Sequence, residues 1–341
     1  MMPAPDGTAE DREAGFVLLS VLLAVALFMA AAASFAIKSH LAALQAGNRL
    51  EQARARALAD GAVLFAADAL AAAQAEAGPP KAPGGTAPPA PAKLRPLPFA
   101  ADGSPLACAL SDGRAIEIVV IDQGGLLDLN AAPPEMIADL LRRTGLDGER
   151  ALQAAAGIVD FRDENDLPEA GGPSEAAAYR EAGKPWGPRN GAFLDAAEIA
   201  QLPAFPPDLA TRLQPLFTVH NGAAGLDVSV MDRRARALLP KEIEESSDLE
   251  RWRTPSRRRA FALDAALRRE DGTVAAARHG LVTFGETGPE APADEAGTPH
   301  PPRIQEWRET LVPPSAERLP ASASPLCERL RRALEGTPGA G

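Results

Sequence analysis

Residues 16–37 have the sequence FVLLSVLLAVALFMAAAASFAI, and this stretch decides the architecture of the chain because none of its 22 residues is charged. Its only hydroxyl groups belong to Ser20 and Ser34. At about 1.5 Å per residue, a helix of this length extends roughly 33 Å, which is enough to cross the hydrocarbon core of a bilayer. The sequence therefore predicts a single transmembrane helix over residues 16–37.

The flanks of this helix leave its processing open. A secretory signal peptide has a basic start and a small-residue cleavage site such as Ala30–Ala32, but residues 1–15 carry four acidic residues and one base, Arg12. A plain anchor keeps Lys and Arg on the cytoplasmic side, whereas here the nearest basic residue after the leader is Lys38, beyond the span. Neither a signal peptide nor a plain anchor accounts for an acidic leader before the span and basic residues after it.

Beyond the membrane segment, the helical pattern continues to about residue 77. Apolar or small residues recur every three or four positions and predict one packed face: Leu50, Ala53, Ala57, Gly61 and Leu64. Residues 78–98 are rich in Pro, Gly and Ala, which is typical of an irregular linker.

Two sets of predicted strands follow the linker. Asp112-Gly113 favours a hairpin between strands at 106–110 and 115–121, and Asp271-Gly272 favours another between 261–267 and 274–284. A further strand is expected at 303–310. Because a helical stretch from about 128 to 216 separates the two sets, the sequence predicts an α+β fold with a helical insertion.

The insertion has its own helix signals. We expect Asn130 to cap a helix that tolerates Pro133 and Pro134 in its first turn and ends at Gly145. A second helix is expected over 148–161 and another over 207–214. Asp195 and Glu198 have the spacing of a capping box.

Three sequence blocks in the insertion carry a resemblance to a known family. They are IDQGGLLDLNAAP at 121–133, IVDFRDENDLP at 158–168 and PRNGAFLDAAEI at 188–199. Together with Gly15-Phe16 and RIQEWRE at 303–309, they resemble the minor pseudopilin K family of type II secretion. The resemblance implies a pseudopilin fold, in which a long N-terminal helix packs on a small antiparallel sheet that carries a large inserted α-domain of SAM-like or helix-hairpin-helix-like type.

The resemblance also implies a third processing route and a role. In that family a prepilin peptidase cuts after the glycine and methylates the new N-terminus, which here means cleavage between Gly15 and Phe16 and methylation of Phe16. Ser20 stands where most members carry a glutamate, as expected of the subunit that starts the fibre. The implied partners are other minor pseudopilins, and secretion substrates are further candidates. The implied location is the inner membrane, with a single span and a periplasmic C-terminal domain.

The predicted organisation follows from these observations. It comprises a leader at 1–15, the transmembrane helix at 16–37, its continuation at 38–77, the linker at 78–98, sheet regions at 99–127 and 251–312 and the inserted α-domain at 128–250. A disordered tail at 313–341 completes it, with a short helix expected around 328–334.

The insertion also contains an acidic loop. Five carboxylates and Asn165 lie within ten residues, and such a density is stable only when it is solvated or neutralised. Oxygen ligands suit Ca²⁺, although the spacing differs from that of an EF-hand. One interpretation is a solvated loop in which Asp160 pairs with Arg162 or a neighbouring arginine. The family resemblance favours calcium, with Asp163, Asp166 and Glu175 as ligands.

Two other classes of function compete with this interpretation. The insertion also resembles the helix-hairpin-helix proteins of competence systems, which bind DNA. Residues 122–220, however, contain 16 acidic and eight basic residues, most of the net charge of −11, and this charge opposes binding to nucleic acid. An enzyme is disfavoured because the four histidines have no ligand spacing and no catalytic motif is present.

The two cysteines, Cys108 and Cys327, are 219 positions apart. An oxidising periplasm would permit a disulfide. Because Cys327 falls in the predicted disordered tail, we favour Cys108 as an unpaired, buried strand residue.

Overall fold

The computed structural model describes residues 10–75, 96–169, 174–240, 250–285, 302–310, 315 and 319–336. It divides into two compact units, Met1–Ala55 and Arg56–Gly341. Most of the predicted leader, most of the predicted linker, residues 241–249 of the predicted α-domain and parts of the predicted tail lie outside the described residues.

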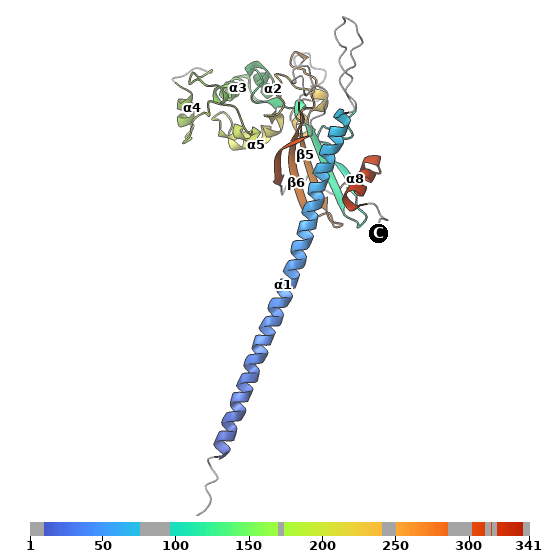
Figure 1. Cartoon of the computed structure of the whole chain (residues 1–341). Coiled ribbons are helices and arrows are strands. Elements are labelled where there is room, and N and C mark those ends of the chain that lie inside the picture. The colour runs from blue at the N-terminus through green and yellow to red at the C-terminus, as the bar shows by residue number, and fades with distance from the viewer. Residues whose placement is uncertain are drawn as a thin grey trace, which may run out of the picture. The chain divides into compact units, whose positions relative to one another are not determined.

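The first unit consists of the helix α1, which spans Glu10–Ala75 and continues into the second unit. Among the described residues, one helix, within Phe16–Gln74, is long and apolar enough to cross a membrane, and its most apolar window has no buried residue. Figure 1 shows this helix in blue. Its large side chains are exposed, from Phe16 (73%) to Ile37 (61%), as expected of a segment that needs a lipid or protein environment.

The second unit is built around a five-stranded antiparallel sheet of order β1-β2-β5-β6-β7. Both predicted hairpins are present, with Gly113 and Gly272 at positive φ in their turns. The strands are β1 (Leu106–Ala109), β2 (Ala115–Asp122), β5 (Ala260–Arg268), β6 (Val274–Thr283) and β7 (Arg303–Glu309).

Residues 56–75 of α1 cover one face of this sheet. The helix packs closely there, because a Cβ on Gly280 of β6 would lie 3.0 Å from Val63 Cγ1. The buried face of the helix consists of small residues and a few larger ones: Ala59, Ala62, Val63, Ala66 and Leu70.

This buried face differs from the predicted one. Leu50 and Leu64 of the predicted stripe are about half exposed (51% and 49%), whereas Asp60, outside this stripe, forms an ion pair with Arg278 of β6. Alanine dominates every face of this helix, so apolar spacing does not identify the side that packs on the sheet.

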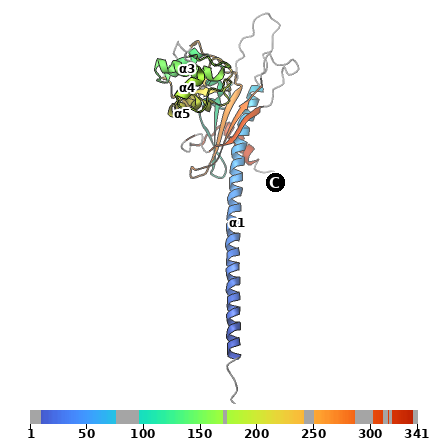
Figure 2. The same cartoon turned by 90° about the vertical axis from the view of Figure 1, so that its left-hand side faces the viewer.

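The insertion lies between β2 and β5 and is mainly helical. Figure 2 shows its helices gathered beside one end of the sheet. Its elements are α2 (Pro134–Arg143), α3 (Gly148–Arg162), α4 (Glu175–Glu181), α5 (Pro207–Leu213) and α6 (Arg233–Arg236), the 3-10 turns η1 (Gln123–Gly125), η2 (Ala196–Gln201), η3 (Gln214–Leu216) and η4 (Val228–Val230), and a parallel pair, β3 (Leu127–Asp128) with β4 (Phe217–Thr218).

Two local predictions for the insertion are corrected. Asn130 does not cap α2, which begins after Pro133 without a side-chain cap. Its side chain instead bonds to the backbone N–H and carbonyl of Phe193 (2.7 and 3.0 Å) and so joins two distant loops. The capping box at Asp195 and Glu198 is present, but it begins the 3-10 turn η2.

The insertion also extends past its predicted end at residue 250. The backbone N–H of Leu226 bonds to the carbonyl of Trp252, and Thr254 N–H bonds to the carbonyl of Leu226. The side chain of Trp252 packs against the core of the insertion. The sheet resumes at Ala260 of β5.

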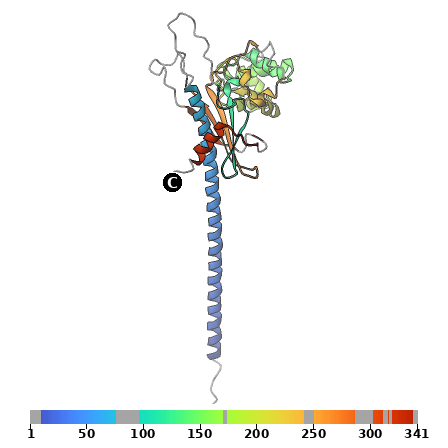
Figure 3. The ribbon, with the colours of Figure 1, turned by 90° about the vertical axis from the view of Figure 1, so that its right-hand side faces the viewer.

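The prediction of an unpaired Cys108 is wrong, and the described part of the C-terminal segment is ordered, with the short helix expected around 328–334 present and slightly longer. Residues Pro325–Glu335 form the helix α8, which lies alongside α1 (Figures 1 and 3). Cys327 of α8 forms a disulfide with Cys108 of β1. Leu334 packs so closely on Gly61 that a Cβ there would lie 2.7 Å from it.

Candidate metal centre

Three carboxylates from two helices meet at the outer end of α3. Asp160 lies in the last turn of α3, Asp163 directly follows this helix, and Glu175 is the first residue of α4. One carboxylate oxygen of each lies within 4.8 Å of the others. These three residues form the acidic cluster.

The packing of α3 places two of these side chains. The Asp147 carboxylate caps the helix by accepting from Arg150 N–H at 2.9 Å. The apolar side of the helix is buried in the core of the insertion, through residues that include Ala154, Ile158 and Phe161. Asp160 and Asp163 therefore lie at the partly buried rim, where the chain turns toward α4.

Glu175 is the unusual member of the acidic cluster. Its side chain is buried, with 1% exposure, yet neither carboxylate oxygen has a hydrogen-bond partner among the described residues. Burial, followed by the charges of Asp160, Asp163 and Asp166, raises the pKa of Glu175 to about 7. Buried carboxylates normally have a partner, but no cation among the described residues offsets the charge of Glu175.

Tyr179 extends the same environment by one helical turn. Its buried hydroxyl group also has no hydrogen-bond partner among the described residues. Burial and the charges of Asp160 and Glu175 raise the pKa of this hydroxyl, which keeps it neutral. It supplies a neutral oxygen beside the three carboxylates.

The loop after α3 folds back over the acidic cluster through local hydrogen bonds. Glu169 N–H donates to Asp160 Oδ1 at 2.9 Å, and burial raises the pKa of Asp160. The Asn165 side chain accepts from Leu167 N–H at 2.7 Å, while its carbonyl accepts from Asn190 Nδ2 at 2.7 Å. These bonds hold the chain between Asp163 and Glu169 without using Glu175.

The structure therefore brings together two of the three ligands that the sequence predicted. Asp163 and Glu175 lie together, whereas Asp166 is exposed and affects the site only through its charge on Glu175. The predicted ligand set did not include Asp160, although its i, i+3 spacing to Asp163 at the end of a helix was a usable signal.

The alternative of an Asp160–Arg162 pair is corrected. Arg162 donates to the backbone carbonyls of Leu129 (2.6 Å) and Ala132 (2.8 Å). Its guanidinium thus ties α3 to the segment before α2 and leaves the acidic cluster without this cation.

Comparison with known proteins identifies the region that contains this site. Residues 118–222, from β2 through the acidic cluster to the turn after β4, match the family described as "Type II secretion system (T2SS), protein K". The match covers 105 of the 341 residues and includes all three members of the acidic cluster.

A solved structure is also similar to this chain. It is the crystal structure of the GspK-GspI-GspJ complex from the enterotoxigenic Escherichia coli type 2 secretion system. The match has 14% sequence identity and a TM-score of 0.41, and covers 61% of this chain and 84% of that chain. A search of curated proteins found no match.

The chemistry of the acidic cluster suits a hard cation. Its donors are all oxygens, three from carboxylates, and Ca²⁺ prefers six to eight such ligands in adaptable geometry. Glu175 shows that the acidic cluster fits a cation, because its buried carboxylate has no hydrogen-bond partner among the described residues and a bound cation would supply one. Asp160, Asp163 and Glu175 are therefore the residues that can hold it.

The N-terminal residues singled out by sequence occupy the regular helix α1. Phe16 is exposed, and the Ser20 hydroxyl donates to the Val17 carbonyl at 2.9 Å within the helix. This bond satisfies Ser20 without a partner subunit, as it would in a bilayer. Cleavage after Gly15 and methylation of Phe16 stay predictions.

Proposed function

We propose that this chain is the minor pseudopilin that starts the type II secretion pseudopilus and remains at its tip. It would be anchored in the inner membrane by α1, with the second unit in the periplasm, and would act by assembly rather than catalysis. The observation that carries the proposal is the position of the protein K region: it is inserted in a sheet that packs on the same helix that is long enough to span a membrane.

Ser20 supports the place at the tip. In the pseudopilin resemblance, a glutamate at this position lies in the bilayer, where it is costly unless it meets the N-terminal amine of a neighbouring subunit. Ser20 satisfies its hydroxyl within its own helix instead. A subunit with no other subunit ahead of it has no use for the glutamate.

Exposed leucines beyond the predicted span support partners of the same kind. Leu41 and Leu44 are 52% and 54% exposed, although they lie past residue 37. Such side chains one turn apart form an apolar face that a second helix would cover. We propose that other minor pseudopilins, counterparts of the GspI and GspJ named with GspK in the similar complex, pack there.

A secretion assay tests this role. Loss of the gene should stop export of folded periplasmic proteins, and the wild-type chain should restore it. The variant Leu41→Arg/Leu44→Arg should insert in the membrane normally but fail to restore export. Ala43→Arg, on the opposite side of the helix, is the matched control and should restore it. Normal export after gene loss would refute the role.

We propose separately that the acidic cluster binds Ca²⁺ through Asp160, Asp163 and Glu175, and that the ion fixes the loop after α3. The proposal rests on the buried, unpartnered Glu175 carboxylate. Calcium at 100 times its dissociation constant should stabilise the full chain in detergent by about 2.7 kcal/mol relative to chelator. Asp163→Asn should lose this gain, whereas Glu164→Gln, its exposed neighbour, should keep it. Equal melting curves with calcium and chelator would remove the site.

A further inference from the structure

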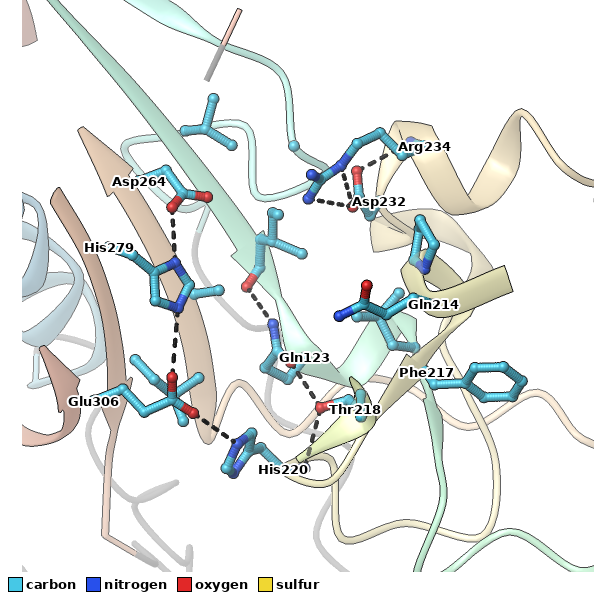
Figure 4. A pocket seen from close by; sticks show the side chains of 18 of the residues that line it. Gln123, Gln214, Phe217, Thr218, His220, Asp232, Arg234, Asp264, His279 and Glu306 are labelled. Atoms are coloured by element: carbon cyan, nitrogen blue, oxygen red, sulfur yellow. Dashed lines mark hydrogen bonds and ion pairs between the residues drawn. The ribbon is translucent and has the colours of Figure 1, made fainter. Parts of the chain in front are cut away.

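Two histidines and one carboxylate meet in a cleft away from the acidic cluster. The cleft has a volume of about 1060 Å³ and lies between the sheet and the inserted helices. Figure 4 shows His220 and His279 on either side of Glu306. His279 Nε2 lies 3.8 Å from Glu306 Oε2, and His220 Nε2 lies 3.8 Å from Glu306 Oε1. Each imidazole therefore approaches its own oxygen of the same carboxylate, from just beyond hydrogen-bond length.

The contact between His220 and Glu306 joins parts of the chain that the backbone does not join directly. The insertion leaves the sheet at the end of β2 and returns at the start of β5, and these two strands are neighbours. Glu306 belongs to β7, an edge strand two places beyond β5, whereas His220 follows β4 in the insertion. The pair thus spans the cleft between the insertion and the outer strands of the sheet.

A hydrogen bond from Asp264 determines what the neutral ring of His279 presents to Glu306. Asp264 of β5 is the register partner of His279 of β6, and its Oδ1 lies 2.7 Å from His279 Nδ1. An ionised carboxylate only accepts hydrogen bonds, so Nδ1 carries the proton and Nε2 of the neutral ring carries a lone pair. This lone pair and the Glu306 carboxylate repel each other, so the neutral ring does not bind Glu306.

The second ring, His220, is neutral in the open cleft because it is partly buried. Burial lowers its pKa, against the opposing charges of Glu306, Asp128 and Asp195. Lowering the pH adds a proton to each ring, and both nitrogen atoms that face Glu306 then become charged donors. Shortening each contact by about 1 Å converts it into a charge-assisted hydrogen bond.

We propose that His220, His279 and Glu306 form a pH-sensitive clasp between the insertion and the sheet. At neutral pH the clasp is open, because the neutral rings are not held by Glu306. In acid each imidazolium binds one oxygen of Glu306, and together they draw the insertion onto β6 and β7. Asp264 is the positioning residue, since it orients the ring of His279. Protonated histidines change protein interfaces in the same way in other pH-dependent switches.

The charged groups around the two histidines favour protonated rings. In the described part of the chain, the carboxylates that line the cleft or act on His220 by their charge are Asp128, Asp195, Asp232, Asp264, Glu306 and Glu309. The guanidinium groups that line the cleft are fewer and belong to Arg233, Arg234 and Arg308. This excess of negative charge favours imidazolium over neutral imidazole.

Two of these groups lie on the same strand as Glu306 without occupying its oxygens. Arg308 lies 3.6 Å from Glu306 Oε2, which is beyond hydrogen-bond length. Glu309 pairs with Arg56 of α1, on the opposite face of β7 from Glu306. Both oxygens of Glu306 are therefore available to the histidines.

The titration of the histidine rings, followed by NMR in the purified full chain in detergent, tests the clasp. Glu306→Gln should lower the titration midpoints of both His220 and His279, because each ring loses its charged acceptor. Glu309→Gln is the matched control: it removes the same charge from the opposite face of β7 and should leave both midpoints unchanged. Asp264→Asn should lower the midpoint of His279 more than that of His220.

A double-mutant cycle tests whether the clasp holds the insertion to the sheet. Urea unfolding of the wild-type chain, His220→Gln, Glu306→Gln and the double variant gives the coupling between the two side chains. This coupling should change the unfolding equilibrium constant about fivefold at pH 5, and less than about twofold at pH 8, where both rings are neutral. All four chains contain Glu175, so its own pH dependence cancels.

The histidine on α1 provides the reference for both measurements. His40 is exposed, and its midpoint should be the same in every variant. The proposal is overturned if either His220 or His279 keeps its midpoint in Glu306→Gln, or if the coupling is the same at pH 5 and pH 8.

Discussion

Cys108 and Cys327 form a disulfide that links the edge strand β1 to the helix α8 across 219 positions of sequence, with their Cα atoms 5.1 Å apart. The segment before α8 lies against the same strand, since Ser322 N–H donates to the Ala107 carbonyl at 2.7 Å. It also reaches a buried ion pair, because Ser315 Oγ donates to Glu117 Oε2 at 2.6 Å, and Glu117 pairs with Arg268 at 2.9 Å. The C-terminal segment therefore covers the β1 edge of the sheet.

The disulfide should contribute strongly to stability. A cross-link that closes so long a loop restricts the unfolded chain, and loss of such a bond costs about 2–5 kcal/mol. The double variant Cys108→Ser/Cys327→Ser should lower the free energy of unfolding in urea by this amount. A reducing agent should have the same effect on the wild-type chain and none on the variant. A difference below about 0.5 kcal/mol would show that the covalent link adds little to the packing of α8.

The acidic cluster should make stability without calcium depend on pH. The pKa of Glu175 is raised to about 7 in the folded chain from an ordinary value of 4.5, so the folded state binds this proton more tightly than the unfolded state. The contribution is fully present below pH 4.5 and is lost as pH rises through 7, with a total on the order of 3 kcal/mol.

Glu175→Gln isolates this contribution. With chelator at pH 8, the variant should be more stable than the wild-type chain, because the unpartnered charge is gone. It should also lose the stabilisation by calcium, which requires the ionised carboxylate. Thermal melting at pH 5 and pH 8 checks both effects, and Glu164→Gln should follow the wild-type chain. A Glu175→Gln chain that is less stable than wild type at pH 8 would contradict this account of the site.

A close backbone approach inside the insertion gives a third prediction. A Cβ on Gly125 would lie 2.6 Å from the Val230 carbonyl oxygen, so η1 and η4 can approach only because residue 125 is a glycine. Gly125→Ala should cost about 1–3 kcal/mol through the forced backbone shift. Gly148→Ala, at the start of α3 with open space around it, should be neutral or slightly stabilising. Equal urea midpoints for the two variants would refute this account.

The sheet and the insertion were predictable because their signals are local. Asp112-Gly113 and Asp271-Gly272 define the hairpins, and alternation along 115–121 identifies a strand. The buried face of α1 was not predictable, because alanine is equally acceptable on every side. The short helix α8 was expected around 328–334, but its disulfide to Cys108 and its packing on α1 were not predictable, because they join segments far apart in the sequence.

The candidate metal centre was predictable in part for a similar reason. The density of acids between Asp160 and Glu169 indicated the loop, but which carboxylates converge depends on how α4 packs against α3. Asp160 lies in the last turn of α3, three residues before Asp163, and so reaches the acidic cluster, while Asp166 is exposed to solvent.

The proposal that this chain is a processed pseudopilin is tested most directly by the mass of its mature N-terminus. Mass spectrometry of the N-terminal peptide, from chain purified from the inner membrane, should identify N-methylated Phe16 following removal of residues 1–15. An intact Met1 would indicate a plain anchor, and a start near Ala33 would indicate a secretory signal peptide. Either of these results would contradict the account.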